Sequence, residues 1–507
     1  MDELIEPAGK DISATALCNA ALGDLSGQVV VPVYDRDRMT PGIVHIGVGN
    51  FHRAHLAWYV HRLMQRGDAT DWAIIGAGVM KNDQAMRQLL LTQDCLTTLI
   101  ELDPDGGQAT EIIGPMLDYL PVEADNAALI RTMSDPQIRI VSMTITEGGY
   151  FIDPKTGGLD TTHPDIRHDA ENPATPRTAF GAMVAALRLR RDSGTGPFTG
   201  LCCDNLQGNG AILRQTVVGL ARLSDPDLAD WIDSHCSFPN SMVDCIVPAT
   251  GPRERQLART IGVDDAAPVT HENFRQWVIE DDFCAGRPDW DLVGAEFSGQ
   301  VHQYETRKIR ILNGGHQILA NIGELMGLDT ISQTMDTPLI NALFRKVQQE
   351  EIAPHVPHMP GVTALDYLKT INRRFANPAI VDTVRRVAFD GSARHVGFLL
   401  PSVRDGLAAS TPVSGLALVE ALWARMCAGT REDGSRIEAN DRMWGMLTTM
   451  ASKAKQDPLI WLQMTQIYGE LASSTRFATA FEEWLTGIYR DGVEATVRRY
   501  INQSLLP

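Results

Sequence analysis

The first three hundred residues alternate short apolar runs with helical stretches, and this alternation limits the folds that are open to the chain. The apolar runs are GIVHIGVG (42–49), WAIIGAG (72–78), IRIVSMTIT (138–146), FTGLCCDN (198–205) and SMVDCIVPAT (241–250). Amphipathic stretches such as ILRQTVVGLARL (212–223) separate several of them. Strands that alternate with helices predict a parallel, doubly wound sheet, in which ligands bind at the carboxyl ends of the strands.

Residues 95–116 interrupt this alternation. In CLTTLIELDPDGGQATEIIGPM the pentapeptide DPDGG is typical of a turn between two extended runs. We therefore predict a β-hairpin inserted in the first half of the chain.

From about residue 300 the pattern changes to long helical periodicities, as in residues 338–352, 416–429 and 476–492. A chain of 507 residues is too long for a single core. We predict an α/β protein with two domains. An N-terminal Rossmann-like, doubly wound domain with the inserted hairpin would span residues 1–298, and a mostly α-helical substrate and catalytic domain would span residues 299–507.

The charge balance narrows the range of partners. The chain carries 63 acidic against 45 basic residues, a formal net charge of −18, which repels nucleic acid and anionic membrane surfaces. No apolar run approaches the 18 residues of a membrane span, and the acidic start MDELIEPAGK does not resemble a secretory signal. We expect a cytoplasmic protein that acts on a small molecule, as a monomer or small homo-oligomer, without nucleic acid or membrane partners.

The eight cysteines include no CxxC pair. Cys202 and Cys203 are neighbours in an apparent strand, where successive side chains point to opposite faces. We expect neither a disulfide nor a shared metal between them.

A nucleotide-binding turn is predicted after the first apolar run. The run continues into GVGNFHRAH, in which Gly47 and Gly49 suit a tight turn and a close approach of the backbone to a pyrophosphate. His52 stands where a dinucleotide fingerprint has its third glycine, so the motif by itself is weak.

The second apolar run contains Gly76 and Gly78 and is followed by Lys81, Asn82 and Asp83. A carboxylate at this place holds the ribose hydroxyls of NAD, whereas a basic group accepts the extra phosphate of NADP. Both kinds of group are present, so the preference between NAD and NADP stays open.

Two HxxH pairs, His52 with His55 and His355 with His358, could place imidazoles on one helix face for a metal ion. Neither pair has a nearby third ligand in the sequence. We therefore expect no metal site.

The segment VHQYETRKIRILNGGHQILA (301–320) mixes polar and aliphatic residues. On one α-helix, an arc of roughly 140° would carry Glu305, Lys308, Ile309, Leu312, Asn313 and His316. Buried polar groups need partners or a purpose. An apolar wall disfavours an ammonium ion, so we expect the pKa of Lys308 to fall towards a useful range for a base. Gly314 and Gly315 would let a cofactor or substrate approach.

Six motifs occur in the same order in the long-chain mannitol dehydrogenase family, the polyol-specific long-chain dehydrogenases and reductases. They are GVGNFHRAH (47–55), TITEGGY (144–150), CDNLQGNG (203–210), FPNSMVD (238–244), the KxxxxNxxH of residues 308–316, and DGSAR with FLLP (390–401). The chain resembles this family over nearly its whole length after about residue 40.

The resemblance implies a metal-independent, NAD(P)-dependent oxidoreductase that interconverts a polyol and a ketose, of the mannitol and fructose type, by hydride transfer. By this likeness Lys308 is the general base, Asn205 and Asn313 bracket the alkoxide, His316 positions the substrate hydroxyl and Glu305 relays the proton. The likeness assigns substrate binding to Asp244, Arg386 and Arg394. It assigns cofactor binding to Gly47, Gly49, Asn50, Phe51, Arg53, Gly76, Asp83 and Glu147, with NAD as the cofactor and NADP left open.

Two departures from the family pattern keep the substrate open. Cys245 follows Asp244 where arginine is common, and Arg394 with His395 stands where lysine is frequent. Arginine binds carboxylates well, so a hexuronate reductase acting on fructuronate or tagaturonate is the alternative.

Two unrelated classes compete with a dehydrogenase. One is a metal-dependent isomerase or hydrolase built on His52, His55, Asp204 and His316. The other is a nucleotide-sensing protein that has lost the reaction, against which the intact set of Lys308, Asn313 and His316 argues.

Overall fold

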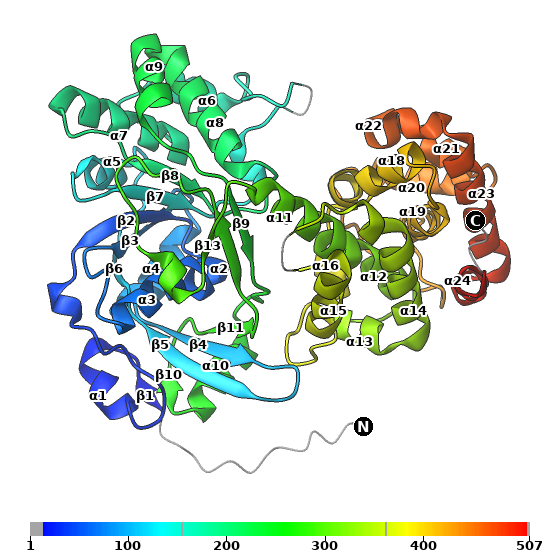
Figure 1. Cartoon of the computed structure of the whole chain (residues 1–507), viewed down its shortest axis with the longest axis horizontal. Coiled ribbons are helices and arrows are strands. Elements are labelled where there is room, and N and C mark those ends of the chain that lie inside the picture. The colour runs from blue at the N-terminus through cyan, green and yellow to red at the C-terminus, as the bar shows by residue number, and fades with distance from the viewer. Residues whose placement is uncertain (1–13, 154–155, 360–361, 504–507) are drawn as a thin grey trace. The chain divides into compact units, whose positions relative to one another are not determined.

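The computed structural model describes residues 14–153, 156–359 and 362–503, and it divides into two compact units, Met1–His302 and Gln303–Pro507 (Figure 1). Within the described residues, all the strands lie in the first unit and the second unit is built of helices. The predicted combination of a doubly wound domain and a helical domain is confirmed.

A parallel sheet forms the centre of the first unit. Its five strands run in the order β6-β3-β2-β7-β8, with every neighbouring pair parallel. Numbered along the chain, this is the order 3-2-1-4-5 of a Rossmann sheet, whose ligands bind where the order reverses. The strands are β2 (Pro41–Ile46), β3 (Ala73–Ala77), β6 (Met116–Tyr119), β7 (Ile140–Met143) and β8 (Thr199–Cys202).

Helices cover both faces of this sheet, which explains why its strands read as continuous apolar runs. One core contains Cys202 and the apolar side of α7, and the other contains Leu201, Cys203 and the apolar side of α3. The two neighbouring cysteines thus face opposite cores, as predicted. The longer helices of the unit are α3 (Leu56–Gln65), α4 (Asp83–Leu91), α5 (Ala127–Ser134), α6 (Pro164–Glu171), α7 (Ala179–Ser193), α8 (Asn209–Ser224), α9 (Pro226–His235) and α10 (Pro252–Thr260).

The predicted hairpin is confirmed. β4 (Thr97–Leu102) and β5 (Gln108–Ile113) pair antiparallel, and β11 (Val269–Glu272) adds to β4 in parallel. A small pair formed by β1 (Thr15–Ala16) and β10 (Val263–Asp264) makes a further sheet.

The apolar run at residues 241–250 does not belong to the parallel sheet. Its strand β9 (Ser241–Asp244) pairs antiparallel with β12 (Gln276–Ile279), which pairs with β13 (Glu296–Phe297). The prediction of one sheet was wrong here because an apolar run identifies a strand without naming its partner. The strand also ends early, before Pro248, which has no amide hydrogen for a ladder.

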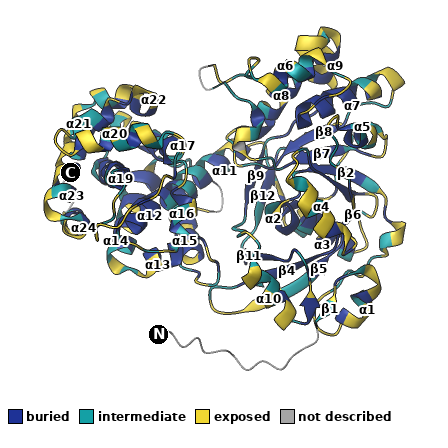
Figure 2. Cartoon of the chain, turned by 180° about the vertical axis from the view of Figure 1, so that it is seen from behind, coloured by how far each residue is buried: buried dark blue, intermediate teal, exposed yellow. Residues whose placement is uncertain are grey.

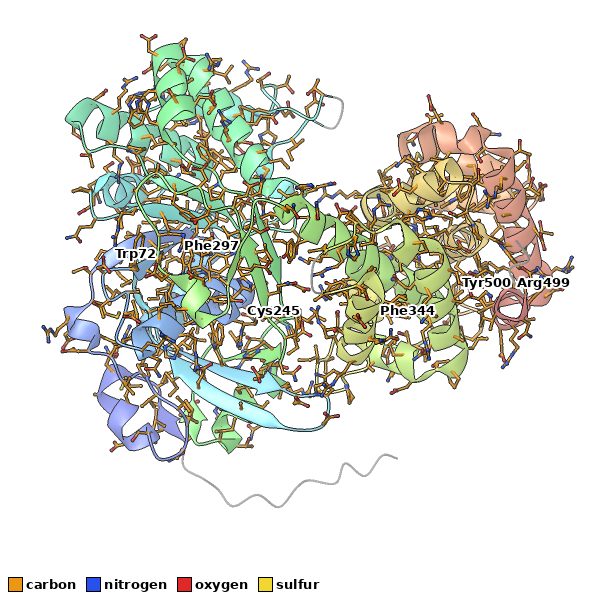
Figure 3. All side chains as sticks on the ribbon, viewed as in Figure 1. Trp72, Cys245, Phe297, Phe344, Arg499 and Tyr500 are labelled. Carbon is orange, nitrogen blue, oxygen red and sulfur yellow. The ribbon has the colours of Figure 1, made fainter. Side chains whose placement is uncertain are left out.

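The second unit is built around two of its own helices, which are buried on nearly every side (Figure 2). They are α12 (Gly314–Leu325) and α19 (Ser414–Met426). Side chains fill its interior, among them Phe344 (Figure 3). Other helices are α11 (Val301–Arg307), α13 (Ile331–Asp336), α14 (Pro338–Val347), α15 (Ala364–Phe375), α16 (Val384–Val387), α17 (Gly391–Arg394), α18 (Leu400–Ala408), α20 (Trp444–Ala454), α23 (Thr475–Asp491) and α24 (Val493–Asn502). No helix in the described part of the chain has the length and apolarity that crossing a bilayer requires.

Three stretches of the second unit are π-helical, namely η5 (Lys308–Asn313), η6 (Gln348–Ile352) and η8 (His395–Leu399). The single α-helix expected over residues 301–320 is therefore wrong. It is divided into α11, η5 and α12. An apolar pattern indicates a helix but does not show where an i→i+5 hydrogen bond replaces an i→i+4 bond.

Two buried histidines, His45 and His52, stack on each other next to β2. His45 in β2 has its Nδ1 2.8 Å from Ser142 Oγ, and its ring stacks on that of His52 at a centroid separation of 3.5 Å. Burial lowers the pKa of His45 to about 3 and holds the pKa of His52 well below its ordinary value. Both imidazoles are therefore neutral in the folded protein at mildly acidic pH.

We expect the protein to lose stability as the pH falls below about 6.5, the pKa of histidine in an unfolded chain. The unfolded chain then binds protons that the folded core excludes. When the pH is lowered from 7.5 to 5.5, each such histidine should lower the free energy of unfolding by about 1.4 kcal/mol. Urea titrations at both pH values should show a loss smaller by about 1.4 kcal/mol in His52→Leu than in the parent.

The exposed His235 offers a matched control in the same unit. His235→Asn should keep the pH dependence of the parent. An undiminished dependence in His52→Leu would contradict the exclusion of protons from this pair.

Candidate functional site

The turn after β2 requires glycine at one position and leaves space at another. Gly47 has a φ of +93°, and a Cβ there would collide with the carbonyl oxygen of Thr144. A Cβ on Gly49 would have no atom within 4 Å. The exposed backbone at Gly49 is thus open to a ligand at the carboxyl end of β2, as a pyrophosphate-binding turn requires.

Two residues assigned to the cofactor also hold this turn in place. The buried guanidinium of Arg53 donates from Nε to Gly49 O at 3.3 Å, from Nη2 to Asn50 Oδ1 at 2.7 Å, and from Nη1 to Ala267 O. Asn50 Nδ2 donates to Pro248 O at 2.7 Å. These contacts fix the turn against the loop that follows β9. A direct contact of Arg53 or Asn50 with a cofactor stays a prediction.

The pair His52 and His55 does not share a helix face. His55 lies at a break between α2 (Asn50–Ala54) and α3, where φ is −119° and ψ is −96°. Its ring stacks on Phe51 and its Nε2 lies 3.1 Å from Gln276 O, whereas His52 stacks on His45. Because the helix breaks, the three-residue spacing of the sequence does not bring the two rings together.

The second HxxH pair is equally separate from any ligand cluster. His355 Nε2 lies 2.8 Å from Thr411 Oγ1. Across the described ranges, the side chains of histidine, cysteine, aspartate and glutamate form no group of three or more that could hold a metal ion.

Asp83 is held at the carboxyl end of β3. Its Oδ2 accepts the amide hydrogen of Met80 at 2.9 Å, and Gly78 leaves the room that its side chain needs. Gly76 lies inside β3, where a Cβ would lie 2.9 Å from Met116 Sδ and from Val48 Cγ2. Gly76 therefore serves close packing, while Asp83 begins α4 shortly after the end of β3, the strand that pairs with β2.

The loop after β7 is strained and is held by Asp204. Thr146 has a φ of +67°, which is costly for a β-branched residue. The Asp204 carboxylate accepts from Ile145 N at 2.9 Å, Thr146 N at 3.1 Å and Tyr150 Oη at 2.6 Å. Glu147 begins η3 (Glu147–Tyr150), and its side chain lies outside the described part of the structure. Sequence reasoning missed this role of Asp204, for which the only signal was its place in the motif CDNLQGNG.

The buried side chain of Asn209 joins the ends of β8 and β9. Its Nδ2 donates to Ser241 O at 2.8 Å, Asp204 O at 3.1 Å and Cys202 O at 3.3 Å. Its Oδ1 accepts the amide hydrogen of Ser241 at 2.9 Å. One amide thus ties the parallel sheet to the second sheet, a role that sequence reasoning missed because the partners lie more than thirty residues apart.

Asn205 and Asp244 are the predicted site residues on these two strands. Asn205 is exposed just beyond the carboxyl end of β8. Asp244 is the last residue of β9 and is only 3% exposed. The relative position of the two strand ends, and so of both residues, depends on Asn209.

We expect Asn209→Ala to lower the free energy of unfolding by about 3 kcal/mol, because it leaves several buried backbone groups without their partner. The exposed Asn172, which makes one bond to His168 O at 3.0 Å, is a matched control in the same unit. Asn172→Ala should cost less than about 1 kcal/mol. Urea titrations of both variants test this, and equal small losses would contradict it.

In the second unit, the π-helical segment η5 carries two predicted catalytic residues at its ends. Lys308 begins η5 and is 8% exposed, and Glu305 lies buried one turn earlier in α11. Asn313 ends η5, and its Oδ1 is buried without a hydrogen-bond partner among the described residues. The segment therefore places a buried lysine and a buried amide group at its two ends.

His316 is oriented by its surroundings in α12. Its ring stacks on Phe375 at 4.2 Å, and its Nε2 lies 3.7 Å from Asp382 Oδ2. Asp382 is buried, and its Oδ1 accepts from Arg386 Nε at 2.7 Å and Nη2 at 2.6 Å. Asp382 thus links His316, a predicted catalytic residue, to Arg386, a predicted substrate residue. The sequence signal that could have found it is its position four residues before Arg386 in VDTVRR.

Arg394 lies against α16, the helix that contains Arg386. Its Nη1 donates to Val387 O at 2.6 Å and to Arg386 O at 3.4 Å, at the end of α16. Arg386 and Arg394, two of the residues assigned to the substrate, are therefore in contact, and Asp382 links Arg386 to His316.

Gly314 and Gly315 do not serve the role expected from the sequence. A Cβ on Gly314 would lie 3.2 Å from Phe398 O, and one on Gly315 would lie 2.8 Å from Gln348 Nε2 and 2.9 Å from Phe344 Cε2. Both glycines make room for neighbouring protein segments, so the expected approach of a cofactor or substrate at these positions was wrong.

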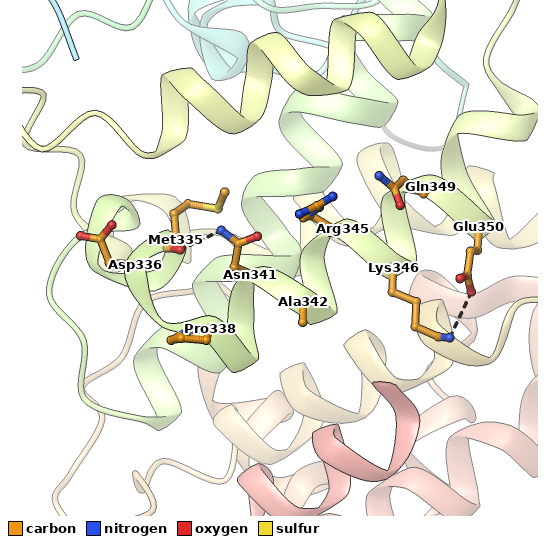
Figure 4. Close-up of a pocket in the computed structure, with 9 residues that line it drawn as sticks. All are labelled: Met335, Asp336, Pro338, Asn341, Ala342, Arg345, Lys346, Gln349 and Glu350. Carbon is orange, nitrogen blue, oxygen red and sulfur yellow. Dashed lines mark hydrogen bonds and ion pairs between the residues drawn. The ribbon is translucent and has the colours of Figure 1, made fainter. Parts of the chain in front are cut away.

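A surface hollow of about 620 Å³ lies elsewhere on the second unit (Figure 4). Lys346 Nζ pairs there with a Glu350 carboxylate oxygen at 3.4 Å. The lining includes none of the predicted site residues and consists of Met335, Asp336, Pro338, Asn341, Ala342, Arg345, Lys346, Gln349 and Glu350.

Comparison with known families covers both units. Residues 41–292 match the family model of the mannitol dehydrogenase Rossmann domain, and residues 300–489 match that of the mannitol dehydrogenase C-terminal domain. A mannitol 2-dehydrogenase of Cereibacter sphaeroides is 54% identical over 477 residues, which are 94% of this chain and 100% of that protein. One of Pyricularia oryzae is 38% identical and covers 97% of this chain and 100% of its own.

Solved structures agree with these matches. The ternary complex of Pseudomonas fluorescens mannitol 2-dehydrogenase with NAD and D-mannitol has a TM-score of 0.89 at 38% identity, and covers 97% of this chain and 100% of its own. A D-sorbitol dehydrogenase in substrate-free form has a TM-score of 0.85 at 34% identity, and covers 95% of this chain and 100% of its own.

Proposed function

This chain belongs to the mannitol dehydrogenase family, and on that premise we propose that it is an NAD-dependent polyol dehydrogenase that interconverts D-mannitol and fructose. The observation that carries the proposal is the match, over 97% of the chain, to a mannitol 2-dehydrogenase that holds NAD and D-mannitol. The open turn at Gly49, and the carboxylate of Asp83 after the second strand of the parallel sheet, fit such a cofactor.

Asp83 supports NAD over NADP. A carboxylate at the end of the second strand binds ribose hydroxyls and repels an added phosphate. NAD, when bound, accepts the hydride that leaves the alcohol carbon. The chain itself must bind the polyol, remove the hydroxyl proton and stabilise the oxygen that becomes negative.

We assign to Lys308 the removal of the hydroxyl proton of the polyol. A general base must be able to accept a proton, and Lys308 is a buried lysine at the start of η5. Glu305, buried one turn earlier, would carry the proton onward. Asn313 and Asn205 would donate amide hydrogens to the developing alkoxide, a contribution that preorganised neutral donors make efficiently.

The charge of Arg386 favours a polyol over a hexuronate. Both of its bonds to Asp382 are shorter than 2.8 Å, so the guanidinium is already paired with a carboxylate. A paired guanidinium can still donate to a substrate hydroxyl, but it offers less to a second carboxylate. The hexuronate reductase activity is therefore the second candidate.

We expect Lys308→Ala to lower kcat for mannitol oxidation by about 10³-fold, because general base catalysis contributes rate on that scale. Binding of NADH, followed by its fluorescence, should persist. Lys369→Ala, which removes an exposed lysine of the same unit, should leave the rate unchanged. Full activity in Lys308→Ala would refute the assignment.

A substrate panel separates the two candidate activities. We expect kcat/KM with mannitol and fructose to exceed that with fructuronate and tagaturonate by at least about 100-fold, since charge mismatch in a polar site is strongly discriminating. In Asp382→Asn, Arg386 loses the carboxylate that pairs with it. The ratio of kcat/KM for the polyol substrates to kcat/KM for the hexuronates should therefore fall. Faster turnover of a hexuronate than of any polyol by the parent would overturn the proposal.

A further inference from the structure

Gln348 reaches from one π-helical segment into the backbone of another. It is fully buried as the first residue of η6, and its Nε2 donates to Ile311 O at 2.8 Å. Ile311 lies inside η5, between Lys308 and Asn313. A side chain from a distant part of the chain therefore holds the backbone that separates the proposed base from the proposed alkoxide donor.

The π-helical form of η5 determines how these two residues are arranged. Lys308 and Asn313 are five residues apart, which on an α-helix places their side chains about 140° apart. In a turn closed by i→i+5 hydrogen bonds, residues five apart approach the same face. The amide hydrogen of Gly314 bonds to Ile309 O, five residues earlier, which closes the π turn, and it also bonds to Ile311 O, the carbonyl that Gln348 holds.

The approach of Gln348 depends on a glycine. A Cβ on Gly315 would lie 2.8 Å from Gln348 Nε2, and its other neighbour would be Phe344 Cε2 at 2.9 Å. A π turn is less favourable than an α turn unless its surroundings support it. Gly315 and Gln348 together supply that support in the interior.

We propose that Gln348 is a positioning residue that keeps η5 in its π-helical form and so holds Lys308 and Asn313 on one face for the reaction. This inference rests on the proposed function, which gives Lys308 and Asn313 their roles. It assigns to Gly315 the task of admitting Gln348.

Two substitutions test the hydrogen bond itself. Gln348→Met keeps the length of the side chain and removes the donor, and Gln348→Glu sets an acceptor against the Ile311 carbonyl. We expect kcat for mannitol oxidation to fall by about tenfold in the first and further in the second, since small displacements of reacting groups are costly. The apparent pKa in the pH profile of kcat should shift in both. The KM for NAD should stay at the parent value, because the nucleotide turn lies in the first unit.

Gly315→Ala provides an independent route to the same defect. It should reproduce the kcat loss and pH shift of Gln348→Met, and the double variant should lose little more than either alone. Gln349 is the exposed neighbour of Gln348, so Gln349→Met is the matched control and should behave as the parent.

An unchanged pH profile and kcat in folded Gln348→Met and Gln348→Glu would overturn the inference. A fall in thermal stability with an unchanged pH profile would also overturn it, because it would show only a structural role. If kcat in Lys308→Ala is about 10³-fold below the parent value in either of these cases, the proposed function stands without the inference. Undiminished kcat in Lys308→Ala would instead remove the role of Lys308 in the proposed function.

Discussion

Backbone groups that leave a regular sheet or helix inside a protein must find another partner, and this constraint is met at the same places where the predicted site residues lie. Asn209 binds the strand ends that carry Asn205 and Asp244. Gln348 binds the carbonyl between Lys308 and Asn313. In both units, therefore, a buried side-chain amide forms hydrogen bonds with backbone groups at a place where the regular strand or α-helix ends.

Irregular backbone of this kind gives the site its shape. A strand that ends, a loop with Thr146 at positive φ and a π turn all aim side chains in directions that regular elements do not offer. Each is stable only because its surroundings compensate for it. The carboxylate of Asp204 does so for the loop, with three hydrogen bonds. Asp204 and Gln348 thus support the backbone next to predicted site residues.

The sequence predicted much of the fold because the physical signals were local. Alternating apolar runs indicated the doubly wound sheet, and the DPDGG turn indicated the hairpin. The position of Cys202 and Cys203 as neighbours in one strand indicated that they face opposite sides of the sheet. Its errors concern partners. The run at residues 241–250 was assigned to the wrong sheet, and the segment at residues 301–320 was taken as one α-helix. Apolar periodicity reports burial, and burial does not specify which strand or which helical register provides the hydrogen bonds.

By itself the sequence determined the order of the elements, the glycine turn and, through its motifs, the family to which the chain belongs. Only the tertiary structure decided which distant side chains support those motifs. Asp382 lies beside His316, and Gln348 lies beside Ile311. In each pair the two residues are far apart in the chain. The physical reason is that a buried hydrogen bond is defined by distance in space. A sequence that shows which groups need partners does not show where the folded chain brings those partners.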